Sequence, residues 1–277
     1  MSMVESSRVE AMTSAISLQG KKVLVTGASR GIGAAIAKSM AEAGAHVIAH
    51  YSSYLEGATE NLKEFPASDK TFIAADLTQP GAGRELFKKA VETVGQVDVL
   101  VNNAGVNIET AFEGDSESWD RGWQETFQVN VFEAANVMKE AVNHFLAPAA
   151  DRRDGRPRGG IVITLSSWSG QKGSALPTLP AYAASKAAVK ALTQTVASSY
   201  AKQGIYAFII SPGIVKTRMA DLAAVVRGGE EKMKAALAMG ELVPPSEVGE
   251  LAVFLASGKC RHLTGSTIDI NGASYVR

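Results

Sequence analysis

Residues Thr26 to Gly33 read TGASRGIG, and this stretch decides how the rest of the chain is interpreted. It follows the apolar run Val23–Val25, typical of a short buried strand, and leads into residues 34–41, which are strong helix formers with apolar positions at helical spacing. Glycine permits positive φ and close approach of a ligand, and a helix N-terminus attracts phosphate. Glycines alone could form a tight turn without a ligand, but the flanking strand and helix favour binding of a dinucleotide pyrophosphate.

Composition is that of an ordinary globular protein. The 277 residues are 46% hydrophobic and 20% charged, with a formal net charge of +0, so no basic excess points to nucleic acid and no charge block to a membrane surface. Cys260 is the single cysteine, which excludes an intramolecular disulfide. Residues 1–17 lack the apolar stretch of a signal peptide and are expected to form a flexible extension. We therefore expect a cytoplasmic protein with no membrane span.

Apolar runs and helical patterns alternate along the rest of the chain. Strands are expected at 23–25, 45–51, 71–75, 97–101, 160–165, 205–210 and 266–270, and helices at 34–41, 58–65, 83–94, 119–145, 181–202 and 246–256. Asp151–Gly159 is rich in Arg, Asp and Gly and is expected to be a surface loop. The alternation predicts an α/β protein with a three-layer, doubly wound Rossmann fold around a mostly parallel seven-stranded sheet, in one domain over residues 18–277. Ligands are expected past the carboxyl ends of the strands.

The end of the second expected strand bears on the choice of cofactor. A dinucleotide fold often has Asp or Glu about 20 residues after the glycines, where it binds the ribose 2′-hydroxyl. Here the strand ends in Tyr51, Ser52 and Ser53, with no acid, and Arg30 lies within the glycine turn. A cation with hydroxyl donors suits a 2′-phosphate, so NADP is favoured over NAD. The alternative is that Arg30 is a surface charge and the serines cap the next helix.

Polar residues also follow the third and fourth expected strands. Asp76 could accept from the adenine amino group while Leu77 packs on the ring, or Asp76 could be the N-cap of the next helix. The amide side chains of Asn102 and Asn103 stand beside Ala104 and Gly105, where they can brace neighbouring strands and leave room for a ribose.

A group of chemically competent residues follows the fifth strand. Ser166 and Ser167 come directly after that strand, and Tyr182 and Lys186 open the next helix. Residues i and i+4 share a helix face, so an ammonium beside the phenol should lower the ordinary tyrosine pKa of about 10. Tyr182 then becomes a usable general acid/base for a carbonyl/alcohol pair, with a serine hydroxyl to hold the substrate oxygen. In alcohol oxidation the pH profile should report a group well below 10.

Together these motifs resemble the short-chain dehydrogenase/reductase family over about residues 18–275. The resemblance implies that Tyr182 is the acid/base, that Lys186 lowers its pKa and binds the nicotinamide ribose, that Ser167 positions the substrate oxygen, and that Asn130 helps relay protons through water to the lysine. It further implies a cofactor site and no metal; the site comprises Gly27, Ser29, Arg30, Gly31, Ile32, Gly33, Tyr51, Ser52, Ser53, Asp76, Leu77, Asn103, Ala104, Gly105, Tyr182, Lys186, Pro212, Gly213, Val215 and Thr217. A homotetramer or homodimer built on paired long helices is also implied.

The sequence departs from the family pattern in the segment between Ser167 and Tyr182, which is two residues longer than in many members. Ser169 could then compete for the role of Ser167. The tail 271–274, Asn-Gly-Ala-Ser, has alanine where the family often has a second glycine, and little effect is expected.

The leading interpretation is an NADP-dependent oxidoreductase of a ketone or secondary alcohol, similar to the 3-oxoacyl carrier-protein reductases. Sugar or polyol dehydrogenases and steroid or aromatic ketone reductases remain open within the family. A nicotinamide-binding regulator and a lyase or isomerase are further alternatives, which the intact catalytic set does not favour. Substrate choice should depend on Trp168, Ser169, the loop 176–179 and the segment 219–242, which reads as a mobile lid.

Overall fold

The computed structural model describes residues 16–148, 157–226 and 228–277. The extension expected at residues 1–17 lies outside the described residues except for its last two. The surface loop expected at 151–159 lies outside them except for its last three.

The seven-stranded sheet is confirmed, and every pair of neighbouring strands is parallel. Its order is β3-β2-β1-β4-β5-β6-β7, so the chain reverses direction across the sheet between β1 and β4. The strands are β1 (Lys22–Val25), β2 (His46–Tyr51), β3 (Lys70–Ala74), β4 (Val99–Asn102), β5 (Gly160–Leu165), β6 (Ile205–Pro212) and β7 (Thr267–Ile270). This order is that of a doubly wound Rossmann fold, in which the switch point is where a ligand binds.

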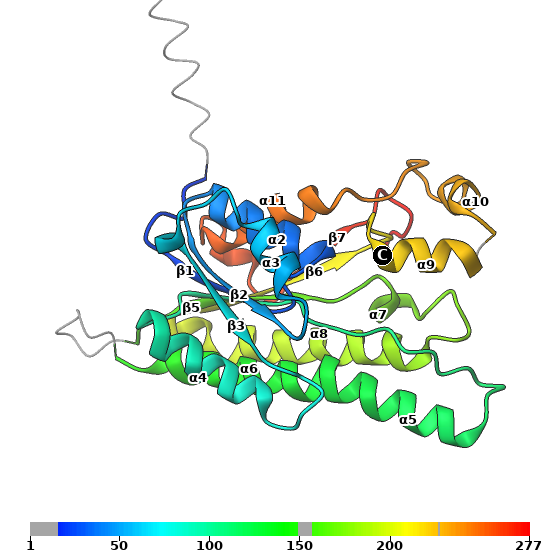
Figure 1. The fold of residues 1–277 in the computed structure, drawn as a ribbon, viewed down its shortest axis with the longest axis horizontal. Helices are drawn as coiled ribbons and strands as arrows, with labels where there is room; N and C mark the ends of the chain where they lie inside the picture. Colours follow the sequence, from blue (N-terminus) through cyan, green and yellow to red (C-terminus); the bar gives the residue numbers. More distant parts are fainter. Residues whose placement is uncertain (1–15, 149–156, 227) are drawn as a thin grey trace, which may run out of the picture.

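Helices cover both faces of the sheet (Figure 1). On one face lie α2 (Gly31–Glu42), α3 (Leu55–Asn61) and α11 (Pro245–Ala256), and on the other α4 (Ala82–Val94), α5 (Ser116–Phe127), α6 (Ala134–Leu146) and α8 (Pro180–Tyr200). Shorter helices are α7 (Ser169–Lys172), α9 (Arg218–Val226) and α10 (Glu230–Ala235), with 3₁₀ turns η1 (Ala67–Asp69), η3 (Ala201–Gln203) and η4 (Arg261–Leu263). The last helical element, η2 (Gln128–Glu133), is a π-helix between α5 and α6.

Two expected helices differ from the structure. The single helix expected at 119–145 is interrupted, because η2 inserts one π turn between α5 and α6. The helix expected at 58–65 begins and ends earlier, at Leu55–Asn61. Its expected last turn instead forms a loop whose carbonyls, at Leu62 and Phe65, both accept from the Lys70 ammonium.

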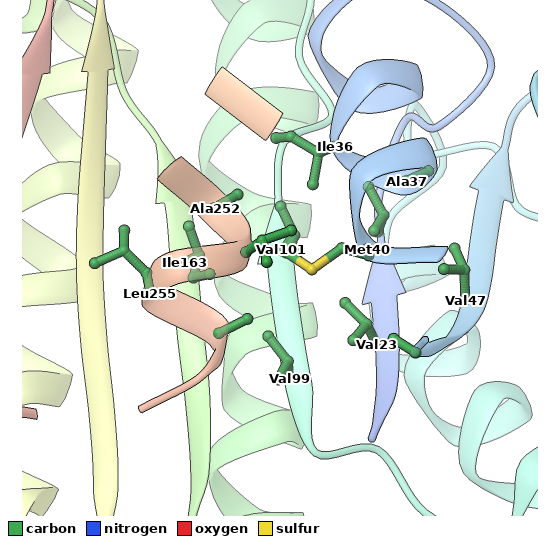
Figure 2. Packing of buried hydrophobic residues seen from close by; sticks show 14 of the residues in the cluster. Val23, Ile36, Ala37, Met40, Val47, Val99, Val101, Ile163, Ala252 and Leu255 are labelled. Atoms are coloured by element: carbon green, nitrogen blue, oxygen red, sulfur yellow. The ribbon is translucent and has the colours of Figure 1, made fainter. Parts of the chain in front are cut away.

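The core is divided by the sheet into two layers, because side chains alternate between the faces of a strand. Val23 and Val25 of β1 pack beneath α2 and α11, whereas Leu24 between them packs against the opposite helices. Figure 2 shows the first layer, where Met40 of α2 meets the central strands at Val101. The same alternation recurs in β4 and β5, so both faces of the central strands are apolar, as expected for a sheet covered on two sides.

Helices α2 and α11 cross at close range. A Cβ added at Gly249 would stand 2.3 Å from the Ser39 Oγ and 3.1 Å from the Ala35 carbonyl oxygen. A side chain at Gly249 would therefore push the two helices apart. This packing fixes α2, whose N-terminus at Gly31 points at the carboxyl edge of the sheet, directly after β1.

Candidate active site

A cavity of about 360 Å³ lies past the carboxyl ends of the central strands. It is lined by residues of the glycine turn, of the loops after β2 to β5, of α8 and of the start of α9. From the predicted cofactor site it includes Gly27, Ser29, Arg30, Gly31, Ile32, Gly33, Ser52, Ser53, Asp76, Leu77, Asn103, Ala104, Gly105, Tyr182, Lys186 and Thr217. The fold thus brings together residues from positions 27 to 217 of the chain in one groove.

Four predicted cofactor residues do not line this cavity. They are Tyr51, Pro212, Gly213 and Val215. Val215 is buried and forms a bridge with Val243, and a Cβ at Gly213 would stand 2.9 Å from the Asn271 Cβ. Val215 thus lies against the segment that follows α10 (Glu230–Ala235), and Gly213 lies against the tail that follows β7. A cofactor role for the four residues stays a prediction.

The glycine turn is braced from the β4 side. The Thr26 Oγ1 accepts from the backbone N–H groups of Asn103 and Ala104 at 2.9 and 3.0 Å, and the Asn103 side chain donates to the Thr26 carbonyl at 2.8 Å. A Cβ at Gly33 would stand 2.1 Å from the Gly27 carbonyl oxygen, so only glycine fits there. The bracing role expected for the asparagine amides is therefore what the structure shows for Asn103.

The start of α2 suits an anionic group. Its first turn holds no acidic residue, and Arg30, its N-cap, makes no side-chain cap hydrogen bond. The N-terminal N–H groups and the helix dipole face the cavity at Gly31, Ile32 and Gly33. Gly31 has a φ of +59°, a left-handed conformation that favours glycine, and a Cβ there would only touch Thr217 at 3.4 Å. These residues fit the pyrophosphate of a dinucleotide.

Two cations that the sequence analysis did not single out stand near this turn. Lys216 and Arg218 line a second cavity of about 550 Å³, which shares Arg30, Gly31, Tyr54, Thr217 and Arg218 with the first. Three positively charged residues, Arg30, Lys216 and Arg218, thus line the second cavity next to the glycine turn. The signal was present in the sequence as two basic residues flanking Thr217, the position that the family resemblance implies for cofactor binding.

His50 is a further residue that the sequence analysis missed. Its Nδ1 accepts from the Gly27 N–H at 3.0 Å, and its Nε2 donates to the Ala75 carbonyl at 3.0 Å. Burial lowers the pKa of His50, so the neutral imidazole that this pattern requires is the favoured form. Because side chains alternate along β2, His50 lines the cavity while its neighbour Tyr51 does not.

The loops after β2 and β3 settle two alternatives on helix capping. The N-cap of α3 is Tyr54, without a side-chain cap, so Ser52 and Ser53 do not cap that helix. Asp76 does not cap α4, whose N-cap is Gly81; instead its Oδ1 accepts from the backbone and hydroxyl of Thr78 at 3.0 and 2.8 Å. These hydrogen bonds lower the pKa of the Asp76 carboxyl and keep it ionised.

Tyr182 and Lys186 lie on one face of α8, as the i,i+4 spacing predicts, with the Lys186 Nζ 5.8 Å from the centre of the phenol ring. The ammonium donates to the Leu165 carbonyl at 2.9 Å, which anchors it at the end of β5. Burial lowers the pKa of Lys186 to about 8. Burial also raises the pKa of Tyr182, and the Ser167 hydroxyl offsets this only in part, so in the protein alone the direction is opposite to the expected lowering.

Asn130 lies in the π-helix η2 and is buried. Its carboxamide accepts from the Val106 N–H at 2.8 Å and donates to the Val106 carbonyl at 2.9 Å and the Ser185 Oγ at 3.0 Å. A Cβ at Gly105 would stand 3.2 Å from the Asn130 Oδ1 and 3.3 Å from the Lys186 Nζ. Asn130 and Lys186 therefore converge on the backbone at Gly105, at one end of the cavity.

The geometry favours Ser167 over Ser169 as the serine of this set. Ser167 is buried beside Tyr182, whereas Ser169 begins α7 and donates its backbone N–H to the Ser167 Oγ at 3.1 Å. A backbone donor on the Ser167 oxygen leaves its own proton free to point at a bound oxygen. The Ser167 role stays a prediction with this support.

Within residues 16–148, 157–226 and 228–277, no three His, Cys, Asp or Glu side chains are grouped to hold a metal ion. In the same part of the chain, no helix combines the length and apolar character needed to cross a membrane. The cavity is lined by the glycine turn, Tyr182 and Lys186, while Ser167 contacts the Tyr182 phenol and Asn130 holds the backbone of the lining residue Val106. Such a fold and site define a dehydrogenase/reductase that acts on CH–OH groups.

The chain belongs to the short-chain dehydrogenase/reductase family. The profile of the family described as Enoyl-(Acyl carrier protein) reductase matches residues 27–273. One similar protein is 3beta-hydroxysteroid dehydrogenase 1 of Eggerthella lenta, which is 35% identical over 92% of this chain and 94% of its own length. Another is oxidoreductase UcpA of Escherichia coli K12, which is 36% identical over 94% of this chain and 96% of its own length. A solved structure of a 3-oxoacyl (acyl-carrier-protein) reductase from Agrobacterium tumefaciens with NADP bound is 31% identical and superimposes with a TM-score of 0.81. The match covers 98% of this chain and 99% of that structure's chain.

Proposed function

We propose that this protein is an NADP-dependent reductase that converts a ketone to a secondary alcohol, with 3-oxoacyl thioesters as the leading substrate class. The observation that carries the proposal is the pairing of Tyr182 with Lys186 at one end of the dinucleotide groove. The Agrobacterium reductase with NADP bound supports both the cofactor and the substrate class. The Eggerthella steroid dehydrogenase supports a steroid ketone as the second candidate.

The bound nicotinamide would supply the hydride for the carbonyl carbon. Tyr182 donates a proton to the carbonyl oxygen, and Ser167 holds that oxygen by a hydrogen bond. Because burial raises the pKa of Tyr182, the phenol stays protonated at neutral pH, which is the form that reduction requires. Proton donation leaves a phenolate on Tyr182, whose negative charge the nearby Lys186 ammonium stabilises. Asn130 fixes the backbone at Val106.

A substrate screen that follows NADPH oxidation tests this proposal. We expect turnover of a 3-oxoacyl thioester above that of a steroid ketone or a keto sugar. Preference for the steroid would favour the second candidate. No turnover on any ketone, with NADPH still bound, would favour the regulator hypothesis instead.

Arg30 should set the preference for the phosphorylated cofactor. Arg30 lines both cavities, and Ser52 and Ser53 line the first of them. A charge-assisted hydrogen bond contributes about 1.5–3 kcal/mol, so Arg30→Ala should weaken NADPH binding roughly 10- to 100-fold and leave NADH binding nearly unchanged. Fluorescence titration of both cofactors checks this, with Lys38→Ala on the exposed side of α2 as the control. Equal affinity of the unmodified protein for NADPH and NADH would contradict it.

We also propose that α5 and η2 carry a subunit contact of a homotetramer or homodimer. Five aromatic rings run along this surface with centroid spacings of 5.3 to 6.5 Å; they are Phe112, Trp119, Trp123, Phe127 and Phe132. Phe112 is 69% and Phe132 55% exposed, which makes an apolar surface of the kind that marks protein contacts. Trp119→Glu should shift sedimentation at micromolar concentration toward a smaller species, while Val276→Glu should not. A monomeric unmodified protein would refute the assembly.

We place residues 18–277 in a single domain and the protein in the cytoplasm. One continuous sheet supports the first statement, since strands from β1 to β7 all belong to it. Cys260, the single and exposed cysteine, suits a reducing compartment.

A further inference from the structure

Glu133, the last residue of the π-helix η2, is a buried carboxylate with no part in the chemistry described above. It is 1% exposed, and its two oxygens accept four hydrogen bonds. The Oε2 accepts from the Gly83 N–H at 2.7 Å, and the Oε1 accepts from the Gly81 N–H at 2.9 Å. The side-chain amides of Gln128 and Asn136 donate to the Oε1 as well, each at 3.0 Å.

The charge of Glu133 is stabilised by the start of α4. That helix has Gly81 as its N-cap and no side-chain cap of its own. Backbone N–H groups at a helix N-terminus need acceptors, and the helix dipole favours a negative charge there. Glu133 therefore supplies from η2 the cap that α4 lacks. A buried carboxylate without such donors would be costly, so the site is built for this side chain.

The contact between the two elements leaves no spare room. A Cβ at Gly83 would stand 2.6 Å from the Glu133 carbonyl oxygen and 3.0 Å from its Oε2. Glycine at position 83 thus allows α4 to approach η2 closely enough for both cap hydrogen bonds. Movement of the α4 start would be transmitted to η2 through this contact.

The two elements lead to opposite parts of the groove. The loop before α4 contains Asp76, Leu77 and Thr78, which line the cavity on the side predicted for adenosine. On the other side, η2 contains Asn130, whose carboxamide is bonded to Ser185, the residue before Lys186. Gln128, which donates to Glu133, lies in the same π turn as Asn130.

We propose that Glu133 is a positioning residue that couples the nucleotide-binding loop before α4 to the π turn that holds Asn130. It acts through backbone and side-chain placement, without contact with substrate or cofactor. The proposal rests on the proposed function, in which Asn130 and Lys186 serve reduction. It requires that loss of the Glu133 cap weakens dinucleotide binding and lowers turnover together. It also requires that the lower turnover results from displacement of Asn130.

The test is Glu133→Gln, which keeps the shape but places an amide NH₂ against one of the two backbone N–H donors. We expect the KM for NADPH to rise and kcat to fall, each on the order of 10-fold, because small displacements of positioned groups are costly in rate. Glu140→Gln on α6, a half-buried acid that pairs with Lys139, is the matched control and should change neither.

A double-mutant cycle separates positioning from a general loss of stability. In an Asn130→Ala background, Glu133→Gln should leave kcat unchanged within about 2-fold while still raising the KM for NADPH, since kcat effects that pass through one residue do not add. Additive effects on kcat, or a lowered melting temperature with unchanged kcat and KM, would overturn the proposal.

Two further measurements test the coupling if Glu133→Gln does not fold or if the unmodified protein is inactive. If Glu133→Gln does not fold, Asn136→Ala removes a single donor and should shift the same two parameters in the same direction by a smaller factor; unchanged values there would also overturn the coupling. If the unmodified protein turns over no ketone, the proposed function fails instead. The NADPH titration of Glu133→Gln against the control then still tests the effect on the nucleotide-binding loop.

Discussion

Tyr182→Phe should reduce kcat by a factor on the order of 10²–10⁴, the range expected for loss of a positioned general acid/base. The substitution removes the transferable proton and keeps the ring that packs beside Lys186. NADPH binding should largely survive, because the glycine turn is held by Asn103, directly after β4, and by His50 of β2, in contacts that do not involve the phenol. Steady-state kinetics and a fluorescence titration of NADPH check the two parts separately.

A near-normal kcat in Tyr182→Phe on a good substrate would contradict the acid/base assignment. The proton would then have to come from Ser167 or from a bound water. Ser167→Ala is the companion variant: it should also lower kcat while leaving NADPH affinity unchanged, because its hydroxyl faces the phenol and not the glycine turn. The regulator hypothesis predicts no turnover in any of these proteins.

Lys186→Ala should damage both turnover and cofactor affinity, which distinguishes it from Tyr182→Phe. The ammonium is anchored to the Leu165 carbonyl and lines the groove beside Gly105, and in the proposed function the same charge stabilises the phenolate and binds the nicotinamide ribose. We expect kcat to fall on the order of 10²-fold. The KM for NADPH should rise on the order of 10-fold, which corresponds to the loss of one charged hydrogen bond. Circular dichroism should remain that of the folded protein.

The pH dependence gives a second test of the lysine. Burial lowers the pKa of Lys186 to about 8, so the ammonium is present below about pH 8 and is lost above it. NADPH affinity of the free protein should therefore decrease as the pH rises through this range. In Lys186→Ala the affinity should be lower and nearly independent of pH between 7 and 9. A pH-independent affinity in the unmodified protein would show that the Lys186 charge does not contribute.

The sequence predicts the sheet because its signals are local. Each strand is a short apolar run and each long helix has its own periodicity, so the seven parallel strands follow from alternation and from right-handed crossovers. The π turn at 128–133 does not follow, because its residues are ordinary helix residues and the extra residue in the turn is held by distant partners, such as Val106 on the carboxamide of Asn130.

In the candidate site, too, features set by neighbouring residues could be predicted, whereas those set by distant residues could not. The spacing of Tyr182 and Lys186 correctly places them on one helix face, but the spacing carries no information on burial, which raises the pKa of the phenol. At the end of β2 the sequence predicts Tyr51 as a cofactor-binding residue, whereas the alternation of side chains along the strand places His50 in the lining of the cavity. Glu133 gives no signal of its capping role, since the two backbone N–H groups that it caps lie some fifty positions away in the chain.

The position of β1 in the sheet has a consequence for how the protein is made. β1 pairs with β2 on one edge and with β4 on the other, and Val23 faces Val99. During synthesis, β2 and β3 are complete before β4. The edge of β1 that pairs with β4 therefore lacks its partner while the residues between β1 and β4 are added. At about 5–20 residues per second this interval lasts roughly 4–15 s. An open apolar edge is a template for pairing with another chain, so a nascent chain arrested before β4 should be prone to aggregate.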